Sequence, residues 1–242
     1  MKHLIRSGVV VCVALSVQST VVAAEIETSS NVTLVSDYIF RGISQTNEDP
    51  AIQGGIDLTS NAGWYAGVWG SNIGFGDGSL EADIYGGWRY ISDASWSFDV
   101  GAIRYIYPGG NNADSEFNYN EVYTHLSYQD ATLSVVYSDD YFGAGVNQFV
   151  YVAVAYSYPI AEQLSLELST GFNKFESGAE LTRFLGGEPT SDDSYWDGSL
   201  GINYQLSDKL SVNLTYIATD MSDSACSEVC DNRLVFGVRS SF

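Results

Sequence analysis

The amino-acid sequence predicts an all-β protein, a transmembrane antiparallel up-and-down β-barrel of about 12 strands preceded by a cleaved signal peptide. Three observations lead to this fold class. Alternating, aromatic-rich segments of about ten to thirteen residues follow one another, their connections are alternately short and long, and a secretory leader precedes them. An even number of strands with tight turns at one end and larger loops at the other is typical of a bacterial outer-membrane barrel.

Residues 1–24 have the three parts of a secretory signal peptide. A charged start is followed by the short apolar run 8–17, and small residues at 22–24 precede an expected cut at Glu25. The apolar run is shorter than the roughly 20 residues that a spanning helix needs. The remaining residues, 25–242, are expected to form one barrel domain in the bacterial outer membrane.

The connections between the segments differ in length and in charge. Tight turns are expected at 61–63, 92–94, 129–130, 159–162 and 206–208. Longer, acidic loops are expected at 41–50, 74–79, 108–117, 142–147, 176–193 and 221–230. The first connection is long, so the N-terminus is expected on the periplasmic side.

Within the segments, side chains alternate between two faces, as they do in a strand. The segment 163–175, for example, places Leu164 and Leu166 on one face and Ser165 and Glu167 on the other. In a spanning barrel the apolar face meets lipid and the polar face meets the lumen.

Two segments follow this alternation less clearly. The segment 64–73 carries aromatic residues on both faces, so its facing is left open. In 95–107, Arg104 shares its face with Trp96 and Phe98. An arginine facing lipid near the midplane costs roughly 2–4 kcal/mol. Arg104 is therefore expected either near a membrane interface or, after a bulge that switches the faces, in the lumen.

The chain ends inside its last expected strand, 231–242, on an apolar alternation that finishes at Phe242. This pattern resembles the C-terminal signal that outer-membrane barrels present to their insertion machinery. The expected partners are therefore that machinery, the outer-membrane lipid and, through the acidic loops, lipopolysaccharide.

The charge balance is strongly acidic, with 30 Asp and Glu against 10 Lys and Arg and a formal net charge of −20. Nucleic acid is excluded as a partner because its phosphates need basic side chains. An acidic surface or lumen attracts cations. The aromatic share of 14% indicates an ordered chain rather than the disorder that a high net charge can produce.

Cys226 and Cys230 lie in the last long loop, four residues apart. In an exported protein this spacing predicts a local disulfide. Two cysteines without a nearby histidine do not make a zinc site, and no cofactor is expected.

Strand alternation assigns a set of acids to the lumen, and five arginines and one histidine are candidates to face them there. The acids are Asp37, Asp57, Glu81, Asp83, Asp99, Glu121, Asp140, Glu167 and Asp197, and the other members are Arg41, Arg89, Arg104, Arg233, Arg239 and His125. Nine acids against five arginines favour cations in a passive channel.

The segment Ser36-Asp37-Tyr38-Ile39-Phe40-Arg41-Gly42-Ile43-Ser44-Gln45-Thr46 resembles the N-terminal hallmark of the TorF family of porins. Further matching blocks are 50–57, 64–69, 81–87, 99–108, 121–123 and 138–141. The resemblance implies an outer-membrane barrel that acts as a porin for small hydrophilic solutes, with no catalytic residue.

Two rival functions remain beside the porin. One is a barrel plugged by its own side chains, with a structural or adhesive role exerted through acidic loops. The other, a barrel hydrolase, is disfavoured because His125 is the one histidine after the leader and no Gly-x-Ser-x-Gly motif occurs.

Overall fold

Twelve antiparallel strands close into a single barrel in the computed structural model, which describes residues 25–109, 111–112 and 115–242. The predicted signal peptide, residues 1–24, lies outside the described residues. The barrel strands are β1 (Ile26–Val35), β4 (Ala51–Ser60), β5 (Trp64–Asn72), β6 (Leu80–Ile91), β7 (Trp96–Ile106), β10 (Tyr119–Tyr128), β11 (Ala131–Ser138), β12 (Phe149–Ala161), β13 (Leu164–Lys174), β14 (Ser194–Ser207), β15 (Leu210–Thr219) and β16 (Arg233–Ser241). The predicted fold class is confirmed.

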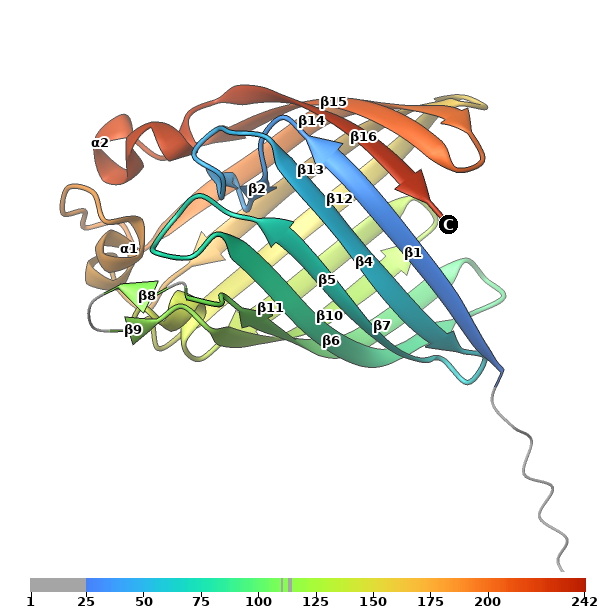
Figure 1. Ribbon diagram of the computed structural model, residues 1–242, viewed down its shortest axis with the longest axis horizontal. Helices are drawn as coiled ribbons and strands as arrows, with labels where there is room; N and C mark the ends of the chain where they lie inside the picture. The colour runs from blue at the N-terminus through green and yellow to red at the C-terminus, as the bar shows by residue number, and fades with distance from the viewer. Residues whose placement is uncertain (1–24, 110, 113–114) are drawn as a thin grey trace, which may run out of the picture.

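Each barrel strand pairs with the next barrel strand along the chain, and β1 pairs with β16 to close the sheet. Closure leaves no strand edge unpaired, which is the condition for a sheet to cross a bilayer. The start of β1 and the end of β16 lie at the end of the barrel with the short turns, here called the turn end (Figure 1). The opposite end, with the long connections, is called the loop end.

Smaller elements gather at the loop end (Figure 1). They are the hairpins β2 (Ile39–Phe40) with β3 (Ile43–Ser44) and β8 (Asn111–Asn112) with β9 (Ser115–Glu116), the α-helices α1 (Gly178–Leu185) and α2 (Asp223–Cys226), and the 3-10 helices η1 (Tyr141–Gly143) and η2 (Ser227–Cys230). No helix in the described part of the chain has both the length and the apolar character to cross a membrane.

Large apolar side chains cover the outside of the barrel. On β15 and β16, for example, Leu214, Tyr216, Leu234 and Phe236 are each 44–65% exposed although the strand carrying them is fully paired. In water such a surface would be unfavourable, whereas lipid accepts it. This apolar exterior and the closed sheet fit a bacterial outer membrane.

The facing of the two irregular segments follows from the register. On β5, Trp64 and Val68 point outward, and Tyr65 and Trp69 are half-buried on the inner face. The pairing of β7 with both neighbours runs without a bulge. Arg104 therefore keeps the outward face.

Two residues assigned to the lumen from the sequence lie elsewhere. Arg104 is exposed near the loop end of β7 and donates to Asn120 Oδ1 over 3.2 Å, so it avoids the midplane cost. Asp140 follows the end of β11 and is exposed at the start of η1. Because Arg104 and Asp140 leave the set, the predicted nine acids and five arginines of the lumen become eight acids and four arginines. The acidic excess is unchanged.

The predicted disulfide between Cys226 and Cys230 is present and joins α2 to η2. Both cysteines are buried within the cluster of apolar side chains that fills the loop end of the barrel.

Candidate functional site

The connection between β1 and β4, residues 36–50, folds as a hairpin across the loop end of the lumen and is called L1 here (Figure 1). Ile39 pairs with Ser44 and Phe40 with Ile43, which leaves Arg41 and Gly42 as the two turn residues. Both have positive φ, 51° and 83°, as a type I′ turn requires.

Gly42 also lies against the wall of the barrel. A Cβ at this position would overlap the Thr219 methyl group and sit 3.0 Å from Asp197 Cβ. Glycine is thus required twice, for the turn and for the close approach. The Tyr195 hydroxyl donates to the Arg41 carbonyl, so β14 holds the tip of L1 from this side.

The Arg41 side chain extends from the tip to the wall formed by β10. Its guanidinium makes two hydrogen bonds with the Glu121 carboxylate, of 2.7 and 2.9 Å, and the two side chains are 6% and 2% exposed. Burial alone lowers the pKa of Arg41, but the Glu121 carboxylate raises it well above the usual value overall. The Arg41 guanidinium therefore stays charged where it contacts the Glu121 carboxylate.

Four aromatic rings surround the Arg41 guanidinium at 4.5–5.4 Å from their centroids: Phe40, Tyr141, Phe149 and Tyr151. Such rings attract a cation through their negative faces. They also bury most of the Arg41–Glu121 bridge, which makes the loss of either partner costly.

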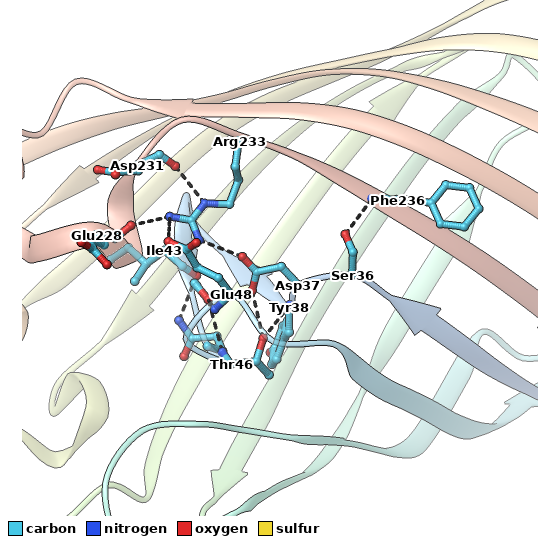
Figure 2. Close-up of polar contacts among 12 residues, drawn as sticks. Ser36, Asp37, Tyr38, Ile43, Thr46, Glu48, Glu228, Asp231, Arg233 and Phe236 are labelled. Carbon is cyan, nitrogen blue, oxygen red and sulfur yellow. Dashed lines mark hydrogen bonds and ion pairs between the residues drawn. The ribbon is translucent and has the colours of Figure 1, made fainter.

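A second anchor ties L1 to β16 and to the connection before it (Figure 2). Arg233 bonds the Asp37 carboxylate at 2.9 Å and the Glu48 carboxylate at 3.2 Å. The same side chain donates to the carbonyls of Glu228 and Asp231, which flank the end of η2. We call these five residues the Arg233 clamp.

The polar residues of L1 complete the clamp. Asp37 accepts hydrogen bonds from Ser44 Oγ at 2.6 Å and from Thr46 Oγ1 at 2.9 Å. Asp37 is therefore a structural centre of L1 that is 5% exposed, and its carboxylate is shielded from the lumen.

On the β6 side, the Tyr38 hydroxyl donates to Glu81 over 2.8 Å. Glu81 and Asp83 are 1% and 4% exposed, and among the described residues no hydrogen bond reaches Asp83 Oδ1. Neither carboxylate is paired with an arginine or lysine among the salt bridges of the described residues.

Aromatic side chains close the remaining space at the loop end. Tyr119 stacks on Tyr105 at 4.3 Å, and Tyr141 stacks on Phe149 at 3.8 Å. Phe142, at φ 56°, packs among them. Tyr141 is 1% exposed and is a core residue of the loop end.

The turn-end half of the lumen is hollow. A cavity of about 810 Å³ is lined by Asp57, Arg89, Asp99 and His125 together with tyrosines of β5, β6 and β10. Arg89 pairs with Asp99 at 2.7 Å and keeps 55% of its side chain exposed. A further cavity of about 350 Å³ shares His125 with the first and reaches the Arg41–Glu121 bridge.

The other wall carries the remaining predicted residues. Asp197 accepts from Asn173 at 2.8 Å and from Tyr151 at 3.3 Å, and Glu167 accepts from two serines. Arg239 has the inward parity of β16 near the turn end and is exposed. The structure therefore brings Arg41 to Glu121, Arg89 to Asp99 and Arg233 to Asp37, and leaves Arg239 apart from them.

His125 lies between Ser134 and Asp99 on the neighbouring strands. Its Nδ1 is 2.8 Å from Ser134 Oγ. The two oxygens of Asp99 accept from Tyr65 and Arg89, and no hydrogen bond joins Asp99 to the imidazole among the described residues. A Ser–His pair without an orienting acid lacks the arrangement of a hydrolytic triad. Ser134 was not singled out in the sequence, because cross-strand neighbours appear only once the register is known.

Residues 20–242 match one family model, described as "Bacterial protein of unknown function (Gcw_chp)". The chain belongs to this family. The Gcw_chp description carries no activity, so the TorF resemblance of the L1 segment stays a prediction. No curated protein sequence matches the chain.

Solved porin structures share the fold of this Gcw_chp protein. The KdgM porin superposes with a TM-score of 0.54 at 8% identity, covering 88% of this chain and 99% of that chain. The KdgM porin in complex with disordered oligogalacturonate has a TM-score of 0.54 at 8% identity, covering 89% of this chain and 99% of that chain. The NanC porin has a TM-score of 0.50 at 10% identity, covering 89% of this chain and 98% of that chain. At such identities the similarity establishes the barrel fold.

Proposed function

We propose that this protein is an outer-membrane channel of the porin type for small hydrophilic solutes, closed at its loop end by L1 in the conformation described. The observation that carries the proposal is the division of the lumen. A polar cavity of about 810 Å³ lies at the turn end, whereas L1 and the aromatic side chains packed on it fill the loop end. L1 is held by side-chain contacts, which can break and let it move out of the lumen. The strands of the barrel wall are held by continuous backbone hydrogen bonds and cannot move in this way.

The wall residues support a preference for cationic or neutral solutes. The half-buried Asp57 and Glu167 form no ion pair among the described residues, whereas Asp37, Asp99 and Glu121 are each neutralised by an arginine. Unpaired carboxylates in a confined lumen concentrate cations and repel anions. The TorF resemblance of the L1 segment and the porin fold support the channel itself and carry no solute preference.

A barrel with a permanent plug and a structural or adhesive role is the second candidate. It is favoured by the aromatic packing at the loop end, where Tyr119, Tyr141, Phe149 and Phe175 are at most 1% exposed. In this function the acidic loops would meet lipopolysaccharide or other cells. The terminal Phe242 would serve insertion in either case.

Planar-bilayer conductance separates the two candidates. In the test variant, residues 39–44 are replaced by two glycines, a short connection that is feasible because Gln45 N–H donates to the Tyr38 carbonyl at 2.7 Å. We expect small or rare openings from the natural chain and steady conductance from the variant. Arg104→Ala, which lies outside the lumen, serves as the control for insertion.

In a salt gradient, the reversal potential of the shortened variant should report cation preference. Adding Asp57→Asn should reduce that preference, most clearly at low salt, where the Debye length approaches about 30 Å. A folded, inserted variant that carries no current would refute the channel and favour the permanently plugged barrel.

A further inference from the structure

The turn-end cavity is lined by three tyrosines from one wall of the barrel, on the adjacent strands β5 and β6 and on β10, which β7 separates from β6. Tyr65 on β5 stands opposite Gly87, Tyr85 on β6 stands opposite Gly67, and Tyr123 on β10 stands opposite Gly101. All three tyrosines line the cavity of about 810 Å³.

Each opposing glycine makes room for its tyrosine ring. A Cβ on Gly67 would overlap the Tyr85 ring, and a Cβ on Gly101 would lie 2.5 Å from the Tyr123 hydroxyl. The rings therefore lie across the neighbouring strand and rest on bare backbone. Their second faces are turned to the cavity, which remains open because the rings lie along its wall.

Hydrogen bonds fix the outer end of each ring. Tyr85 donates to Asp57 over 2.5 Å, and Tyr65 donates to Asp99 over 2.6 Å. The hydroxyls of Tyr65 and Tyr123 are 2.8 Å apart. A site whose side chains are already ordered loses little entropy when a ligand binds.

The polar groups alternate acceptor and donor along this wall. One oxygen of Asp57 is engaged by Tyr85, and the Arg89 guanidinium, although bound to Asp99, stays 55% exposed. A solute that carries many hydroxyl groups can donate to the carboxylates and accept from the guanidinium. Its C–H face can rest on the aromatic faces, which are apolar and electron-rich.

We propose that the turn-end cavity is a binding subsite for neutral polyhydroxylated ring solutes of mono- or disaccharide size. The inference rests on the proposed function for the route such a solute takes through the barrel. An anionic solute is disfavoured because Asp57 and Asp99 already line the wall and Arg89 is neutralised by Asp99. A volume of about 810 Å³ is within the usual range of roughly 300–1,000 Å³ for small-molecule sites.

The test is isothermal titration of the full-length barrel, purified in a detergent without a sugar headgroup, with trehalose and separately with glucuronate. We expect saturable binding of trehalose and weaker or no binding of glucuronate. Tyr85→Ala should weaken trehalose binding by about tenfold or more, and Tyr85→Phe should weaken it less because the ring stays. Tyr216→Ala, on the lipid-facing side of β15, should leave it unchanged.

The outcomes separate this inference from the channel itself. Absence of saturable trehalose binding, equal binding of glucuronate, or full binding by a folded Tyr85→Ala variant would each overturn the subsite. Steady conductance of the shortened L1 variant together with any of these results would leave the channel standing. Trehalose binding without conductance would instead overturn the channel and retain a solute-binding barrel.

Discussion

The two halves of the lumen are built from the same kinds of residue and yet differ in state. At the loop end, tyrosines and phenylalanines pack on one another and on L1, and the space is full. At the turn end, Tyr65, Tyr85 and Tyr123 rest on glycines, and the space is hollow. The comparison teaches that aromatic content does not decide whether a barrel is filled. What faces each aromatic ring across the sheet decides it.

The charges differ in the same way. Arg41 bonds Glu121 with both side chains nearly inaccessible, whereas Arg89 bonds Asp99 with more than half of its side chain in the cavity. A buried pair depends on both partners, while an exposed pair contributes little. Removing a charge should therefore disturb the loop end far more than the turn end.

The largest expected effect comes from Glu121→Gln, which leaves the Arg41 cation buried without its counter-charge. Breaking a buried pair costs about 3–5 kcal/mol. We expect L1 to leave the lumen, which lowers the urea midpoint of the loop-end core and raises the bilayer conductance. Adding Arg41→Gln should restore part of the stability, because no charge is then left unpaired. If the Glu121→Gln variant were as stable as the natural chain and conducted as little current, the Arg41–Glu121 bridge would not hold L1 in place.

Gly42→Val tests the close contact between the tip of L1 and the barrel wall at Thr219. Valine is strained at a φ of 83°, and its side chain would overlap Thr219. We expect conductance to rise nearly as much as on shortening L1. Gly186→Ala is the matched control: its φ is 71°, but no atom lies within 4 Å of the added Cβ. Equal conductance of the two variants would mean that backbone strain alone opens the lumen.

At the turn end, Gly67→Leu should push the Tyr85 ring off the wall and into the cavity. Overpacking of this kind costs about 1–3 kcal/mol. We expect the fold and the closed state of L1 to persist. The largest neutral polymer that enters the shortened L1 variant should become smaller, as measured by polymer exclusion from the conductance. Gly198→Ala, on the outward face of β14, is the comparison, because an added Cβ there lies 3.5 Å from its nearest neighbour, the Ser169 carbonyl oxygen.

The smallest effect is expected from the double substitution Cys226→Ser and Cys230→Ser. Closing so short a loop contributes about 2 kcal/mol in the chain-entropy model. The disulfide lies beside the carbonyl of Glu228 that accepts from Arg233, so its loss should loosen the Arg233 clamp without opening the barrel. More frequent brief openings in single-channel records would support this, and a fully open channel would show that the disulfide itself holds L1.

Local patterns in the sequence determined the strand number, the turn and loop ends and most of the facing. The reason is that strand alternation has a period of two residues and turn chemistry is local. This basis alone predicts that the apolar face of each strand meets lipid, and Leu214 and Leu234 indeed lie exposed on the outside of the barrel. The same parity directs Arg104 to the outer face. The structure shows that Arg104 lies near the loop end, away from the midplane where a lipid-facing arginine would be costly.

Only the tertiary structure decided that L1 turns inward and closes the lumen. The contacts that hold it join Arg41 to a residue 80 positions away and Asp37 to one 196 positions away. A closed sheet brings such residues face to face across the lumen, and no periodic pattern along the chain records which inward side chain meets which. The pairing of Tyr85 with Gly67, which keeps the turn-end cavity open, likewise exists only in the register of two strands.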